Sequence, residues 1–176
     1  MFLMEPKELG ATHATQVTEF VGELLPEFNT ASGNVRVGLL TSHCGGGNVE
    51  LQEFRDELEM AAAFQSTPMS TLAPMVRQLR THSYKEENGG RDAARHMAVI
   101  FVDDALFDPE AVLKEARRSR HHDVEIFVVA IGDSVVEAEV AALCSEPTDR
   151  HIIRVPSYDA LKSSKDTFLQ HFCHGL

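Results

Sequence analysis

The sequence predicts an α/β fold in which helices cover both faces of a doubly wound, mostly parallel central sheet. Two apolar runs carry this prediction: "MAVIFVDD" contains a strand over residues 97–102, and "VEIFVVAIG" contains a strand over residues 125–131. Such continuous apolar runs are typical of parallel strands that are buried on both faces. A helical pattern separates the two runs, so the chain has the strand, helix, strand order of a right-handed crossover.

The helix between these strands has clear boundary signals. Asp108 is the expected N-cap, and Pro109 occupies the first helical position. Val112, Leu113 and Ala116 supply the apolar face of this helix. The basic run "RRSRHH" falls at its C-terminal end, where positive charge complements the helix dipole.

The remaining elements follow from the same periodicities. The acidic segment 50–64 fits an edge strand followed by a helix, and its assignment is left open. Elsewhere we expect strands over residues 1–5, 35–40 and 150–155, and helices that end near Pro26 and that cover residues 70–79, 134–144 and 157–172.

Length and composition indicate one compact domain that spans residues 1–176. The chain has 176 residues, 43% of them hydrophobic, and a formal net charge of −11. This negative charge disfavours nucleic acid as a partner. No apolar run reaches the ~18 residues that span a bilayer, so we expect no membrane insertion. Because Met1 begins almost inside a predicted strand, we expect the chain to be a fragment of a longer multidomain protein.

The first candidate site is the pair of carboxylates that ends the strand 97–102. Asp103 and Asp104 fall at the carboxyl end of a parallel strand, where open α/β sheets place their binding sites. The alternative is that two solvated carboxylates merely begin a loop.

A second candidate is the loop "SHCGGGN". Cys44 follows His43 and could be a thiol nucleophile, but adjacent residues at a strand end point to opposite sides, which favours an ordinary thiol. The three glycines could cradle a phosphate, but they lack the spacing of a dinucleotide-binding motif, which favours a surface loop. With three cysteines at least one thiol is unpaired within the chain, and a bridge between Cys144 and Cys173 stays topologically open.

The order of these segments resembles a known family. The series "STLAPMVRQLRTHSYKEENGGR", "MAVIFVDDALFDPEAVLKEAR", "VEIFVVAIG", "EVAALCSEPTDRHIIRV" and "SYDALK" is similar to von Willebrand factor type A domains of the collagen VI and matrilin kind. The resemblance implies a noncatalytic module that binds proteins, among them collagen or other matrix proteins, in an extracellular location. It also implies that Cys173 pairs with a cysteine outside this chain.

Many members of this family hold a divalent cation in a metal-ion-dependent adhesion site at the top of the sheet. By resemblance, Asp103 and Ser70 occupy two of the three ligand positions in this chain. In the first loop Glu5 replaces an aspartate, and Lys7 lies where the family has a serine. A hard cation needs several oxygen ligands, and Lys7 would repel it. We therefore expect weak or absent Mg²⁺ binding, no other cofactor, and a top face for protein ligands formed by Glu5, Lys7, Ser70, Asp103 and Asp104.

The charges on this face suggest a role for Lys7. Without a metal, Glu5, Asp103 and Asp104 would repel one another, so Lys7 is expected to pair with Asp103 or Asp104 in place of the cation. Two alternatives to an extracellular binding module remain. One is an intracellular scaffold of the same fold with all three cysteines reduced, and the other is a small α/β enzyme that uses Cys44 or Asp103.

Overall fold

The computed structural model describes residues 1–173 except 6–8, 29, 31–32 and 42–71. In this part of the chain, five parallel strands form one sheet in the order β2-β1-β3-β4-β5. The strands are β1 (Phe2–Leu3), β2 (Leu39–Leu40), β3 (His96–Val102), β4 (Val124–Ile131) and β5 (Ile152–Val155). The predicted parallel α/β sheet is thus confirmed, and its order places the two apolar strands, β3 and β4, side by side with β1 next to β3.

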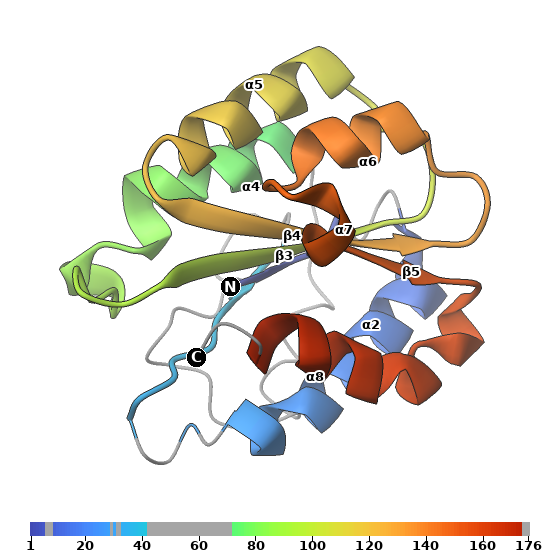
Figure 1. Ribbon diagram of the computed structural model, residues 1–176, viewed down its shortest axis with the longest axis horizontal. Coiled ribbons are helices and arrows are strands. Elements are labelled where there is room, and N and C mark those ends of the chain that lie inside the picture. Colours follow the sequence, from blue (N-terminus) through green and yellow to red (C-terminus); the bar gives the residue numbers. More distant parts are fainter. Residues whose placement is uncertain (6–8, 29, 31–32, 42–71, 174–176) are drawn as a thin grey trace.

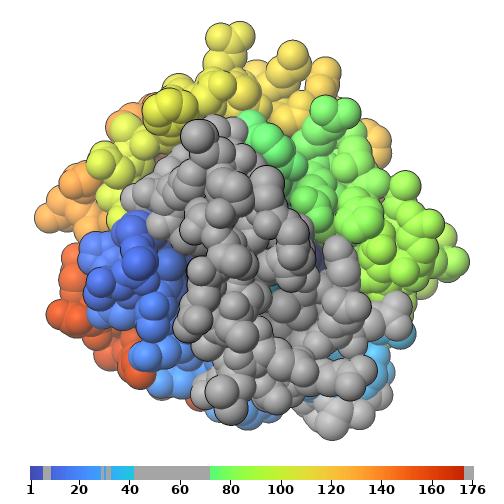
Figure 2. Space-filling model, turned by 180° about the vertical axis from the view of Figure 1, so that it is seen from behind, coloured from blue at the N-terminus to red at the C-terminus, as the bar shows by residue number. Residues whose placement is uncertain are grey.

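Helices pack on both faces of this sheet (Figure 1). One face is covered by α4 (Leu72–Gln78), α5 (Pro109–Arg120) and α6 (Glu137–Leu143). The other is covered by α2 (Ala11–Leu24) and α8 (Lys165–Cys173). The short α7 (Thr148–His151) leads into β5. Seen from behind, α2 and residues 80–95 lie on opposite flanks of the molecule (Figure 2).

The alternation of side chains along β3 explains the two layers. Ala98, Ile100 and Val102 pack with α4, α5 and α6, whereas Val99 and Phe101 pack with α2 and α8. All five are at most 6% exposed. Because β3 is apolar on both sides, neither face can be left to solvent, and each requires its own helix layer.

The helix 109–120 begins as predicted. The Asp108 carboxylate accepts a hydrogen bond from the backbone N–H of Ala111 at 3.2 Å, and Pro109 is the first helical residue. Helix α4 ends at Gln78 and continues as a π-helical segment, Leu79–Ser83. The predicted start of this helix and the acidic segment 50–64 lie outside the described residues.

The predicted helix over residues 157–172 is wrong in its first half. Two 3₁₀ turns, η5 (Tyr158–Ala160) and η6 (Lys162–Ser164), precede α8. The hydroxyls of Ser163 and Ser164 both donate to the carbonyl of Ala160 at 2.9 Å. Serine side chains compete in this way with the helical hydrogen-bond pattern.

Four other predicted elements are also too wide. The strand predicted over residues 1–5 covers only Phe2–Leu3. In the predicted strand 35–40, only Leu39 and Leu40 pair with β1. Helix α6 starts at Glu137, after an extended Val136. Residues 148–151 form a helical turn instead of extending β5.

Cys144 is a free, buried thiol, so the bridge to Cys173 that the sequence left open is not formed. The reason is the layer structure. Cys144 belongs to the core under α4, α5 and α6, whereas α8, which carries Cys173, packs on the opposite face of the sheet. The Sγ atom of Cys144 donates to the Ala141 carbonyl at 3.5 Å.

A charged cluster lies at the amino end of β4. The Glu125 carboxylate accepts hydrogen bonds from Arg95, at 2.5 Å from Nε and 2.7 Å from Nη2. It also lies 2.8 Å from Nε2 of His151, whose Nδ1 lies 2.8 Å from the Pro147 carbonyl. Burial raises the pKa of Glu125, but the hydrogen bonds from Arg95 and His151 outweigh burial and leave that pKa below its ordinary value.

We predict that Phe101→Ala lowers the free energy of unfolding by about 3–5 kcal/mol, the usual cost of emptying an aromatic core site. Phe101 is 3% exposed and packs against Phe2 and Phe20, with ring centroids 6.4 and 6.5 Å away. Denaturant melts measure the loss. Phe107→Ala is the control, because Phe107 is 81% exposed and its truncation should change stability by less than about 0.5 kcal/mol. A loss below about 1 kcal/mol for Phe101→Ala would contradict the packing.

We also predict that Glu125→Gln makes the free energy of unfolding less dependent on pH in the acidic range. A lowered carboxyl pKa in the folded state stabilises the fold above the ordinary pKa of 4.5, and this contribution is lost as pH falls through the folded-state pKa. The natural protein should therefore have a larger free energy of unfolding than the variant at neutral pH. This gap between the two free energies should close below pH 4.5. Urea melts at several pH values measure it, with exposed Glu87→Gln as control. A gap independent of pH would contradict the assignment.

Candidate functional site

Polar side chains collect at the carboxyl edge of the sheet. Asp103 directly follows β3, and Glu5 follows β1 by two residues. These two strands pair in parallel, with Leu3 opposite Ile100, so both carboxylates leave the sheet at the same edge. Tyr158 follows β5 at this edge as well.

The centre of the site is a contact between Asp103, Tyr158 and His13. The Tyr158 hydroxyl donates a hydrogen bond to Oδ2 of Asp103 at 2.8 Å. The rings of His13 and Tyr158 are stacked, with centroids 3.8 Å apart and planes inclined by 13°. Nδ1 of His13 lies 3.0 Å from the Leu9 carbonyl and 3.9 Å from Oδ2 of Asp103. Three segments that are distant in the sequence therefore meet at one carboxylate oxygen.

The chemistry of Tyr158 is set by this environment. Burial, then the hydrogen bond to Asp103 and the carboxylate charge, raise the pKa of Tyr158 well above its ordinary value. Each effect disfavours the phenolate. Tyr158 is therefore a neutral hydroxyl that donates to Asp103 throughout the physiological pH range.

Core packing between α2 and the C-terminal segment holds Tyr158 over His13. Leu161 and Phe168 are each 1% exposed, and the Phe168 ring meets Phe20 of α2 edge-on at 5.4 Å. Outside this core, Lys162 forms exposed ion pairs with carboxylates of α2. Burying one large apolar side chain is worth about 1.5–3 kcal/mol, whereas solvent screens an exposed ion pair so that it contributes little. The apolar contacts thus set the position of Tyr158.

Asp104 is not part of this contact. Its side chain is exposed, and its Oδ1 accepts a hydrogen bond from the backbone N–H of Ala105 at 2.7 Å. In the same loop, the N–H of Leu106 donates to Glu139 of α6 at 2.8 Å. Leu106 is 7% exposed, and the next residue, Phe107, is 81% exposed. The hydrogen bonds of Ala105 and Leu106 thus hold this loop in place, and Phe107 presents its aromatic ring to solvent.

The other predicted site residues are placed differently. Glu5 is 3% exposed at the end of β1. Lys7 and Ser70 lie outside the described residues, and so do Cys44 and the adjoining glycines. The structure therefore places Asp103 and Glu5 at one edge, directs Asp104 to solvent, and leaves the predicted pairing of Lys7 without a description.

The described residues of this edge contain few of the ligands that a divalent cation needs. Across the described ranges, no three His, Cys, Asp or Glu side chains come together as metal ligands. One oxygen of Asp103 already accepts the Tyr158 hydroxyl. A hard cation takes six or more oxygen ligands, and Asp103 and Glu5 alone supply too few.

Tyr158 and His13 are not predicted as site residues from the sequence. Asp103 was predicted because binding sites lie at the carboxyl ends of parallel strands. The same rule could have indicated Tyr158, which also follows the carboxyl end of a parallel strand. His13 lies in the first turn of α2, the helix that follows the first strand, which is a comparable position. Their stacking depends on how α2 and η5 pack together, and no sequence spacing indicates that contact.

Within the described residues, no helix has both the length and the apolar character needed to cross a bilayer. This finding agrees with the absence of long apolar runs in the sequence.

Solved structures show the same fold. Proximal thread matrix protein 1 from the mussel byssus superposes with a TM-score of 0.78 over 98% of this chain and 47% of its own, at 14% sequence identity. A second structure of that protein, described as having a zinc-occupied MIDAS motif, has a TM-score of 0.77 at the same identity. At this identity the likeness concerns the fold alone.

Sequence comparison identifies relatives among matrix proteins. Human matrilin-1 is 27% identical over 169 residues, which are 90% of this chain and 33% of matrilin-1. Mouse collagen alpha-1(XX) chain is 26% identical over 162 residues, which are 87% of this chain and 12% of that collagen. The chain thus spans at most about a third of the length of these relatives. The family model of the von Willebrand factor type A domain matches residues 7–167. The chain therefore belongs to the von Willebrand factor type A domain family.

Proposed function

We propose that this chain is a noncatalytic, extracellular module that binds matrix proteins through the loops at the carboxyl edge of its sheet. Matrilins and collagens among its relatives support the matrix setting. Collagen or another matrix protein is the proposed ligand. An intracellular scaffold would have the same fold, and the relatives favour the extracellular reading.

The observation that carries this proposal is the exposed apolar surface beside Asp103. Phe107 is 81% exposed and Val136 is 40% exposed, and they are the exposed large hydrophobic side chains of the described residues. They lie on the loops that follow the neighbouring strands β3 and β4, and the hydrogen bond from Leu106 to Glu139 joins the first of these loops to α6, the helix that follows the second. A rigid exposed aromatic residue surrounded by polar groups is typical of a binding hot spot.

The second part of the proposal is that ligand binding does not need a divalent cation. Asp103 already has a hydrogen-bond donor in Tyr158, and Lys7 is the residue that we expect to supply positive charge in the first loop. A neutral donor and an ammonium group can satisfy these carboxylates without a metal. This proposal also argues against a catalytic role for Asp103, because the site has no activated nucleophile among the described residues that contact it.

We predict that Phe107→Ser weakens binding to immobilised triple-helical collagen by about tenfold or more, since hot-spot residues contribute over 1 kcal/mol. Surface plasmon resonance measures the affinity, with heat-denatured collagen as a specificity control. Lys114→Ser, an exposed change on α5, is the matched control and should bind like the natural protein. Equal loss in both variants, or no loss in Phe107→Ser, would contradict the proposed surface.

We further predict that calorimetry detects no tight binding of Mg²⁺ or Mn²⁺ to the natural protein. Replacing Lys7 removes a positive charge, so Lys7→Ser should gain weak cation binding. Collagen binding by the natural protein should be the same in EDTA as in Mg²⁺. Micromolar cation affinity in the natural protein would overturn the proposed independence from metal.

A further inference from the structure

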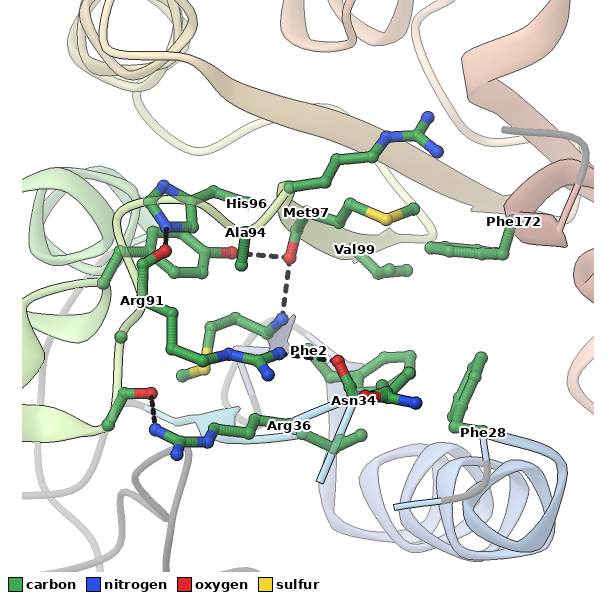
Figure 3. Close-up of a pocket in the computed structure, with 17 residues that line it drawn as sticks. Phe2, Phe28, Asn34, Arg36, Arg91, Ala94, His96, Met97, Val99 and Phe172 are labelled. Atoms are coloured by element: carbon green, nitrogen blue, oxygen red, sulfur yellow. Dashed lines mark hydrogen bonds between the residues drawn. The ribbon is translucent and has the colours of Figure 1, made fainter. Parts of the chain in front are cut away.

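A cavity of about 240 Å³ lies at the amino edge of the sheet, opposite the candidate site. Its walls come from the start of β1 and β3, the segment before β2, the turn before β3, and the ends of α2 and α8. Figure 3 shows the side chains that surround it. The proposed function assigns no role to this cavity.

The cavity is apolar on one side and basic on the other. Phe28 and Phe172 lie together, with centroids 6.4 Å apart, and Val99 adjoins them. Arg36 and Arg91 lie on the opposite side in Figure 3. A ligand that fills this space therefore meets aromatic rings at one end and guanidinium groups at the other.

In the described part of the chain, the two arginines bond to neutral carbonyl oxygens and not to carboxylates. Arg36 donates to the carbonyl of Gly89 at 2.7 Å, and Arg91 donates to the carbonyls of Gly33 and Asn34 at 2.8 and 2.6 Å. Carbonyl oxygens are neutral, and each guanidinium has five N–H donors. Neither arginine forms an ion pair with a described carboxylate, unlike Arg95, which binds Glu125.

The wall that carries Arg91 is held rigidly. The Tyr84 hydroxyl donates to the Met97 carbonyl at 2.5 Å. The backbone of Gly90 packs so closely on Tyr84 that a Cβ atom there would lie 1.8 Å from the Tyr84 carbonyl oxygen. A cavity formed before the ligand arrives loses less conformational entropy on binding.

We propose that this cavity binds a small organic carboxylate with an apolar body, such as a medium-chain fatty acid. The apolar body lies against Phe28, Phe172 and Val99, and the carboxylate pairs with Arg36 and Arg91. The charge selects an anion, because guanidinium groups bind carboxylates with charge-assisted hydrogen bonds. The volume selects a short ligand, since it lies below the roughly 300–1,000 Å³ of typical ligand pockets.

Octanoate is the probe, and calorimetry and ¹H–¹⁵N spectra of the 176-residue protein are the measurements. We expect octanoate to bind with a Kd of about 1 mM or tighter, as suits a ligand of this size, and to shift the amide resonances of Met97 and Val99. Octanol, octylamine and acetate should each bind at least about tenfold more weakly, because they lack the charge, reverse it or lack the apolar body.

Substitutions of the two arginines test whether their charge binds octanoate, and folding controls show that the protein structure is kept. The double variant Arg36→Gln/Arg91→Gln should weaken octanoate about tenfold or more, and Arg36→Lys/Arg91→Lys should restore part of the affinity. Arg117→Gln on α5 removes an exposed charge elsewhere and should leave affinity unchanged. Unfolding melts and unperturbed spectra verify that each variant is folded. The proposal would be overturned if octanoate and octanol bind equally well, or if octanoate does not bind. It would also be overturned if Arg117→Gln weakens octanoate binding as much as the double variant does.

Discussion

The burial of β3 and its neighbours on both faces is the constraint on which the rest of the structure depends. A parallel strand with apolar side chains on both sides requires a helix layer above and below the sheet. One helix layer packs on Ala98, Ile100 and Val102, and the other packs on Val99 and Phe101. Parallel strands also place all their carboxyl ends at one edge. The site around Asp103 and the cavity beneath Phe2 therefore lie at opposite edges of the sheet as a consequence of strand direction.

The sequence predicted the central strands and the helix 109–120 well, because their signals are local. Continuous apolar runs and the Asp108-Pro109 start need no knowledge of the partner segments. The predicted boundaries are wrong where side chains compete with the backbone for hydrogen bonds, or where only a short stretch of a strand pairs with its neighbour. Ser163 and Ser164 bond to the Ala160 carbonyl and replace half of a predicted helix with 3₁₀ turns. Only two residues of the predicted strand 35–40 find a partner in β1.

The candidate site could be predicted in position but not in composition. The direction of the strands predicted Asp103 at the carboxyl edge, and the family resemblance added Glu5; both residues lie at that edge in the structure. Strand direction could not indicate that Asp104 turns to solvent, since that depends on a hydrogen bond within its own loop. It also could not indicate the stacking of His13 on Tyr158, which joins segments 145 positions apart through the packing of Phe20 and Phe168. Contacts of this kind depend on tertiary packing alone.

We propose that protein groups, and not a metal ion, satisfy the carboxylate of Asp103 at the end of β3. A crystal structure grown in excess Mn²⁺ tests it most directly, because Mn²⁺ scatters X-rays anomalously. The account predicts no anomalous peak beside Asp103 and a Tyr158 hydroxyl that remains within hydrogen-bond distance of Oδ2. A Mn²⁺ peak bonded to Asp103, with Tyr158 displaced, would contradict it.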